Sequence, residues 1–208
     1  MIGLYAVTDD CAPSPPAPLR TVTANGLAFV CGPAGTDDCS PERLWEHERV
    51  IERLMEKSDL LPVRYGTRAP DEAAAAQVLR ERHAELADAL EGVRGAVELS
   101  VRAVGQAAAT LPPSEAQTGA AYLRARAREA AERASAAGSV HEPLAQLARA
   151  STRRPGRGDG DLLRAAYLVD RNLIVRFAGR VADIQAARPE LRLLCTGPWP
   201  AYSFSRHE

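Results

Sequence analysis

The chain has 208 residues, of which 46% are apolar and 25% charged, and its formal net charge is −1. This composition is typical of a globular protein and lacks the basic excess that binding of phosphate backbones requires, so we expect no nucleic-acid partner. The chain contains no run of about 18 apolar residues and no charged segment leading into an apolar stretch, so we expect neither a membrane span nor a secretory signal. These patterns indicate a cytoplasmic protein.

The four cysteines are Cys11, Cys31, Cys39 and Cys195. They form no C-x-x-C pair, and no histidine stands at zinc-finger spacing from them. Reduced thiols are the rule in the cytosol, so we expect four free cysteines. The cysteines therefore predict neither a metal site nor a redox centre.

The first predicted elements are two strands, at residues 2–7 and 26–30, separated by a proline-rich loop. A helix follows from Ser40, an N-cap residue, and Pro41, a favoured first helical residue, to about residue 57. Its apolar positions recur at helical spacing and predict one face packed on a sheet. These positions are Leu44, Ile51, Leu54 and Met55.

A strand at residues 60–65, a helix at 71–90 and a strand at 93–104 complete the N-terminal half. The resulting order, β-β-α-β-α-β, predicts an α+β fold. Without the extra pairing strand it is ferredoxin-like, an antiparallel sheet with both helices on one face. We assign this domain to residues 1–110.

The second predicted domain, residues 111–208, is also α+β. Its Ala-, Arg- and Glu-rich start predicts a long helical hairpin over about 114–152, with a second helix at 142–151 after the turn at Gly138 and Ser139. An arginine- and glycine-rich loop at 153–160 follows. A strand at 162–169, a helix at 173–187 and a strand at 191–195 lead into an extended aromatic tail at 197–208.

Catalytic and cofactor motifs are incomplete. His47-Glu48 and His141-Glu142 begin the zinc motif H-E-x-x-H, but Ile51 and Ala145 stand where the second histidine belongs. The phosphate-binding loop G-x-x-x-x-G-K-[ST] and the nucleophile elbow G-x-S-x-G do not occur. His47 shares a helix face with apolar residues, which favours a packing role. We predict no enzyme and no cofactor.

Arg64 stands between Val63 and Tyr65 in the predicted strand at 60–65. Alternation would direct its side chain to the face opposite both neighbours. Two interpretations stay open: a structural ion pair with a helix carboxylate, or a place in a partner-binding surface.

Three aromatic residues, Trp199, Tyr202 and Phe204, gather in the last ten positions. The prolines beside them exclude a helix or a central strand, so the tail should run extended over the surface. The rings either fold back and seal a groove between the two halves, or they form or cover a site for an apolar partner.

The order of several segments resembles the gas vesicle protein F/L family. The segments are a first strand at 2–7, the helix sequence Leu44-Trp45-Glu46-His47, the strand Leu-Pro-Val-Arg-Tyr-Gly-Thr at 61–67, Tyr122-Leu123 opening a long helix, and Gly-Pro-Trp-Pro-Ala-Tyr-Ser-Phe at 197–204. The resemblance covers most of the chain and is weakest at 21–40 and 138–160.

This resemblance implies an accessory protein of gas vesicle assembly. We expect it to bind the hydrophobic major shell protein, to prevent its aggregation and to support nucleation, with other accessory proteins as further partners and a minor shell component as a further role. A self-associating scaffold is the alternative, and a small enzyme is a more remote one. The expected partner-binding residues are Arg64, Tyr65, Trp199, Tyr202 and Phe204.

Overall fold

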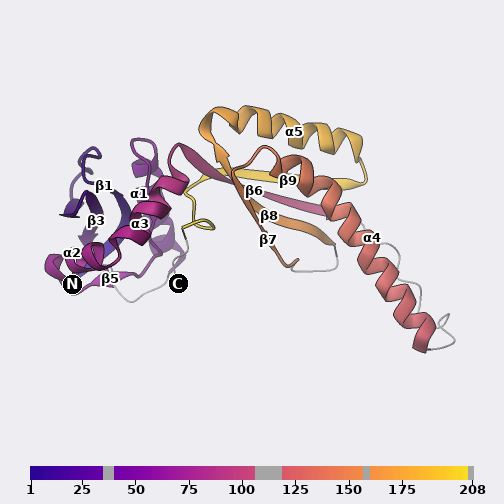
Figure 1. The fold of residues 1–208 in the computed structure, drawn as a ribbon, viewed down its shortest axis with the longest axis horizontal. Coiled ribbons are helices and arrows are strands. Elements are labelled where there is room, and N and C mark those ends of the chain that lie inside the picture. The colour runs from indigo at the N-terminus through magenta and orange to yellow at the C-terminus, as the bar shows by residue number, and fades with distance from the viewer. Residues whose placement is uncertain (35–39, 106–118, 157–159, 206–208) are drawn as a thin grey trace. The chain divides into compact units, whose positions relative to one another are not determined.

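The computed structural model describes residues 1–34, 40–105, 119–156 and 160–205 (Figure 1). The chain comprises two compact units, Met1–Glu98 with Pro198–Glu208, and Leu99–Gly197. We describe each unit by itself. The division into domains at 1–110 and 111–208 concerns parts of the chain that fold separately, and it stays a prediction.

The first unit is built on an antiparallel sheet. Its strand order is β2-β3-β1-β4, and β5 also pairs with β1. The elements are β1 (Ile2–Asp9), β2 (Arg20–Ala24), β3 (Leu27–Pro33), α1 (Pro41–Met55), β4 (Leu61–Pro62), β5 (Arg68–Ala69), α2 (Glu72–Glu81) and α3 (His83–Val93). The predicted strands at 2–7 and 26–30 are confirmed as β1 and β3.

A tight hairpin joins β2 to β3, and the sequence-based prediction included neither the hairpin nor the strand β2. Asn25 and Gly26 both have positive φ, 51° and 85°, and Ala24 pairs with Leu27 directly across the turn. Asn-Gly is the favoured pair for a two-residue hairpin loop because both positions must adopt φ above zero. The dipeptide was therefore a sufficient signal for the strand at Arg20–Ala24.

Helices lie on both faces of this sheet. Ala6 and Val30, partners across β1 and β3, pack with the α1 residues Ile51 and Leu54. The next pair, Val7 and Phe29, faces the other way, toward α2 and α3. The strand β6 (Ala96–Gly105) belongs to the second sheet. The predicted ferredoxin-like layout, with both helices on one face and this strand in the first sheet, is not confirmed.

The α1 start is confirmed, because the Ser40 side chain accepts a hydrogen bond from the Arg43 N–H. The single helix predicted at 71–90 is instead two, which meet at Arg82, where the backbone leaves the helical region. The C-terminal end of α3 is tied to the sheet by Arg94, which donates to Asp9 and Glu91 at 2.9 and 2.7 Å.

The second unit contains a four-stranded sheet of order β7-β8-β6-β9. The other elements are α4 (Gly119–Ala145), β7 (Ala150–Arg154), β8 (Asp161–Asp170), the short helix η2 (Arg171–Leu173), α5 (Ile174–Ala187) and β9 (Leu191–Trp199). The core lies between one sheet face and the helices α4 and α5. The predicted strand at 162–169, helix at 173–187 and strand at 191–195 are confirmed.

The predicted helical hairpin at 114–152 is wrong. A single helix, α4, runs through Gly138 and Ser139 to Ala145, and the segment predicted as its second arm continues into β7. Ala137, Val140 and Leu144 lie on one stripe of α4 and are buried in the core, so packing keeps the helix continuous through the glycine. The N-terminal part of α4 extends beyond the sheet (Figure 1).

The predicted loop at 153–160 is partly wrong, because Arg153 and Arg154 lie in β7. Residues 157–159 of that loop lie outside the described residues. The prediction that the extended tail begins at residue 197 is also partly wrong, because β9 continues through Gly197, Pro198 and Trp199. Since β9 is an edge strand of its sheet, it tolerates a proline. The described residues after Trp199 form neither helix nor strand.

Candidate partner-binding site

An aromatic cluster joins two segments that the sequence singled out. His47 of α1 stacks on Tyr5 of β1, with ring centroids 5.0 Å apart, and meets the edge of Tyr65 at 5.5 Å. Its Nε2–H donates to the Val63 carbonyl oxygen at 2.9 Å. The carbonyl can only accept, so the bond places the proton on Nε2. His47 is buried, which agrees with its predicted packing role.

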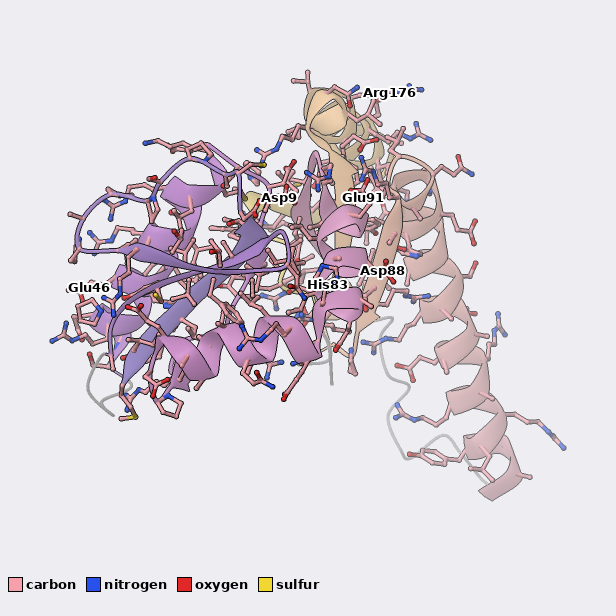
Figure 2. The ribbon with its side chains drawn as sticks, turned by 60° about the vertical axis from the view of Figure 1, so that its left-hand side comes forward. Asp9, Glu46, His83, Asp88, Glu91 and Arg176 are labelled. Carbon is pink, nitrogen blue, oxygen red and sulfur yellow. The ribbon has the colours of Figure 1, made fainter. Side chains whose placement is uncertain are left out.

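A cavity of about 220 Å³ opens beside this cluster, and we call it the motif pocket. Glu46 lines it from α1 (Figure 2) and accepts a hydrogen bond from Arg43 at 3.0 Å. Burial, and secondarily the charge of Glu46, raises the pKa of Tyr5. The other lining residues are Gly3, Leu4, Pro33, His47, Val50, Tyr65, Gly66, Thr67 and Arg68.

Leu44 and Trp45 are exposed on the outer side of α1, at 43% and 60% of their surface. Large apolar side chains at this exposure mark candidate contact surfaces when they lie together. The prediction that Leu44 lies on the packed face of the helix is wrong. Its neighbour Trp45 was not proposed as a binding residue, although the motif Leu-Trp-Glu-His contained it.

Arg64 and Tyr65 follow β4, which ends at Pro62, so strand alternation does not set their directions. Arg64 is exposed, and within the described part of the chain no carboxylate lies at ion-pair distance from it. Tyr65 is half-buried and lines the motif pocket. The surface interpretation of Arg64 gains support over the structural ion pair.

A second cavity, of about 300 Å³, lies over the other face of the same sheet. Its walls are mainly apolar and come from β1, β3, β4 and the helices α2 and α3, and Ser205 closes one side. Val78, on the rim, is 37% exposed. The two cavities together give the first unit concave surfaces on both sides of its sheet.

The three tail aromatics have different environments. Tyr202 packs against the core cluster of α1, and its hydroxyl donates to Glu48 at 2.9 Å. Phe204 is half-buried, whereas Trp199 is 37% exposed. The structure thus packs Tyr202 and leaves Trp199 partly accessible.

The described residues show no metal-binding constellation: no group of three or more His, Cys, Asp and Glu side chains could hold an ion. Cys11, Cys31 and Cys195 are free thiols, and Cys39 lies outside the described residues. None of the described helices has the length and apolar character needed to cross a membrane.

Comparison with known proteins defines the class. Residues 4–206 match the protein family described as "Gas vesicle synthesis protein GvpL/GvpF". The chain therefore belongs to the GvpL/GvpF family. This is a family of gas vesicle proteins and not a known enzyme family.

This chain aligns with three gas vesicle proteins over most of the length of each. Gas vesicle protein F of Streptomyces sp. (strain CB03234) is 29% identical, over 91% of this chain and 89% of the relative. Gas vesicle protein L of the same organism is 31% identical, over 90% and 83%. Gas vesicle protein F1 of Halobacterium salinarum is 27% identical, over 88% and 79%.

The fold is that of solved GvpF structures. The crystal structure of GvpF from Anabaena sp. PCC7120 superposes with a TM-score of 0.85, covering 100% of this chain and 96% of that one, at 19% identity. GvpF from Microcystis aeruginosa gives 0.80, with 99% of both chains covered, at 18% identity. These likenesses confirm a mixed α+β fold with antiparallel sheets.

Proposed function

We propose that this protein binds the major gas vesicle shell protein before it enters the shell, prevents its aggregation and supports nucleation of the vesicle in the cytoplasm. The proposal rests on family membership together with one observation, the exposure of the large apolar side chains of Leu44 and Trp45 on α1. Trp side chains of this kind carry much of the binding energy in protein interfaces. We further propose that the protein is retained as a minor vesicle component and that it binds other gas vesicle accessory proteins.

The mechanism we propose is stoichiometric. A free shell subunit exposes apolar surface, and a partner that binds this form shifts the equilibrium away from aggregation by mass action. Release follows when contacts within the growing shell bury the same surface. Such a cycle requires neither a nucleophile nor a metal ion.

Contact through apolar side chains is favoured over strand addition at β9. The Gln185 amide of α5 donates to the Leu191 carbonyl at 2.7 Å and accepts from the Leu193 N–H at 2.8 Å. This side chain occupies backbone groups that an added strand would use. The edge of the second sheet is therefore blocked at its first residues, while the apolar pair on α1 is open.

The test is coexpression of this protein with the major shell protein, with the soluble shell fraction and the copurified complex measured against shell protein expressed alone. We expect a stable complex and increased solubility. The variant Trp45→Ser should lose most of both effects because the exposed indole is removed. Tyr122→Ser, which removes an aromatic side chain 50% exposed on α4, is the matched control and should retain them.

A complex that forms equally well with Trp45→Ser would contradict the proposed surface, although not shell binding itself. Absence of any complex and of any gain in solubility would contradict shell binding. In that case the protein would act through other accessory proteins.

A self-associating scaffold is the second candidate, and α4 favours it. From Gly119 to Ser135 the helix has no buried residue, and Tyr122 and Leu123 are 50% and 68% exposed. Ion pairs within the helix, such as Arg128–Glu132, support this part of α4, and its exposed apolar pair offers a contact for a second copy of the chain. A mass that rises with concentration in the absence of shell protein would support this role, and a constant monomer mass would contradict it.

A further inference from the structure

A hydrogen bond between two side chains joins α4 to the second sheet. The Nδ1 atom of His141, near the C-terminal end of α4, lies 2.8 Å from the hydroxyl oxygen of Tyr167 on β8. The centroids of the two rings are 5.5 Å apart, and the Phe177 ring of α5 lies 5.2 Å from that of Tyr167. Tyr167 is fully buried, whereas His141 is half-buried. The bond therefore has one partner inside the core and the other at its margin.

The burial of Tyr167 determines which atom donates in this bond. A buried O–H group needs an acceptor, and among the residues that the structure describes His141 is the only hydrogen-bond partner of this hydroxyl. The Tyr167 O–H therefore donates to Nδ1, which requires a neutral imidazole with its proton on Nε2. Protonation would place a hydrogen on Nδ1 as well, and the Tyr167 O–H would then lose its acceptor.

A positive charge lies on the same side of the sheet. Across β7 and β8, Arg153 pairs with Ala165 and Ser151 pairs with Tyr167. Ala165 and Tyr167 belong to the core beneath the helices, and residues directly opposite each other on neighbouring strands share a face. Arg153 therefore lies on the helix side of β7. Burial, and secondarily the charge of Arg153, lowers the pKa of His141 below its ordinary value of 6.5.

The other titratable groups around His141 do not reverse this effect. Glu142, the next residue of α4, raises the pKa of His141, but it is exposed and has the smallest effect of the three. Cys195 of β9 has a pKa raised by burial, so its thiol is neutral in mild acid. Arg188, at the end of α5, donates to Ser139 at 2.8 Å, about 200° around the helix from His141. The charged side chains within α5 are exposed: Arg176, Arg180 and Asp183.

We propose that the hydrogen bond between His141 and Tyr167 is an acid-sensitive latch, which holds the C-terminal part of α4 on β8 and opens when the imidazole takes up a proton. The charged imidazole then turns toward water, because a charge at the margin of the core is poorly solvated. Val140 and Leu144 lie on either side of His141 along α4 and are buried in the same core, so this turn of the helix loosens with it.

The latch stabilises the protein at neutral pH and loses this effect in mild acid. The unfolded chain takes up the histidine proton near the ordinary pKa of 6.5, whereas the folded chain takes it up only at lower pH. The contribution of the latch is therefore complete above pH 6.5 and is lost as the pH falls through the lower pKa of the folded state. The latch shares no residue with the surface proposed to bind the shell protein, so the two proposals can be tested separately.

The test measures hydrogen exchange of the α4 amides in the full chain by mass spectrometry, between about pH 5 and pH 8, with rates corrected for the intrinsic effect of pH. NMR titration of the His141 imidazole gives its pKa. The variant His141→Asn keeps an uncharged acceptor close to the place of Nδ1, and Tyr167→Phe keeps the ring but removes the hydroxyl. His83→Asn, at a half-buried histidine of the first unit, is the matched control.

We expect the protection of residues 137–145 against exchange to fall severalfold on acidification, with its midpoint at the pKa of His141. His141→Asn should abolish this fall, and His83→Asn should retain it. Tyr167→Phe should raise the pKa of His141, because the neutral imidazole loses the donor that favours it.

Protection that does not depend on pH in the parent protein, or that falls equally in His141→Asn, would overturn the proposal. An unchanged pKa of His141 in Tyr167→Phe would also overturn it, and this second measurement decides the question if the asparagine variant fails to fold.

Discussion

The Tyr202 hydroxyl donates a hydrogen bond to the Glu48 carboxylate at 2.9 Å, although the two residues are 154 positions apart in the chain. The bond attaches the C-terminal segment to α1. Tyr202 also contacts the core cluster that contains Ile51 and Leu54. The segment that includes Tyr202 is therefore part of the packing of the first unit.

The first prediction separates two tail aromatics. Tyr202→Ser should lower the free energy of unfolding by about 2–4 kcal/mol, because it removes a packed ring and a hydrogen bond. Trp199→Ser, at a position 37% exposed, should change it by less than about 1 kcal/mol. Urea denaturation measures both. Equal losses would show that Trp199 is packed as Tyr202 is.

The second prediction concerns Glu98, whose buried carboxylate accepts from the Ser203 N–H at 2.7 Å and from the Ser203 hydroxyl at 2.8 Å. Ser203→Ala should cost about 1–2 kcal/mol, because one of two bonds to a buried charge is lost. It should also speed proteolysis of the C-terminal segment. Ser205→Ala, which loses only a long 3.4 Å bond, is the control. A proteolysis rate equal in both variants would contradict the anchoring role.

The third prediction tests His47 as a packing residue. His47→Ala should reduce the free energy of unfolding by about 2–3 kcal/mol, since it leaves the Val63 carbonyl without its donor and empties the space between Tyr5 and Tyr65. His83→Ala, which breaks an exposed bond of the same length to Asn25, should cost about 1 kcal/mol or less. Thermal denaturation distinguishes them, and a larger loss for His83→Ala would count against the aromatic cluster.

The fourth prediction tests the continuity of α4. Gly138→Ala should stabilise the protein by about 0.5–1 kcal/mol, because alanine favours a helix interior and its Cβ would meet only Glu142 at an ordinary 3.5 Å. Gly26→Ala, at a φ of 85°, should destabilise it by about 1 kcal/mol. If Gly138 instead formed a turn with positive φ, both variants would destabilise the protein.

The fifth prediction is an alkaline loss of stability. Burial raises the pKa of Tyr5, Tyr167 and Tyr202 above the ordinary value of 10.0, and the Glu48 charge adds to the effect at Tyr202. The unfolded chain therefore loses these protons first, so their contribution is present below pH 10 and disappears as the pH rises above it. Urea midpoints measured across this range should fall.

Tyr202→Phe removes one of the three ionising groups, so its urea midpoint should fall less steeply above pH 10. Tyr122→Phe, at an exposed ring of α4, should follow the parent protein. Identical slopes for the parent and Tyr202→Phe would show that Tyr202 ionises equally easily in the folded and unfolded chains.

Local chemistry predicted the elements whose signals lie within a few residues. The N-cap of Ser40 with Pro41 began α1 as expected, and alternation identified the strand β6. Asn25-Gly26 carried an equally local hairpin signal that was overlooked. At the candidate site, the sequence indicated His47 and Tyr65 as notable residues of two separate segments. The sequence did not show that Trp45 is exposed. The spacing of apolar residues defines the faces of a helix, but it does not show which face other elements of the fold cover.

By itself, the sequence determined the mixed α+β class, most element types and membership of the GvpL/GvpF family, because residue propensities and motif order are properties of the chain alone. Only the tertiary structure decided that α4 passes through Gly138, that β6 joins the second sheet and that Tyr202 packs on α1. These outcomes depend on contacts between distant residues, whose burial outweighs local preferences of about 1 kcal/mol.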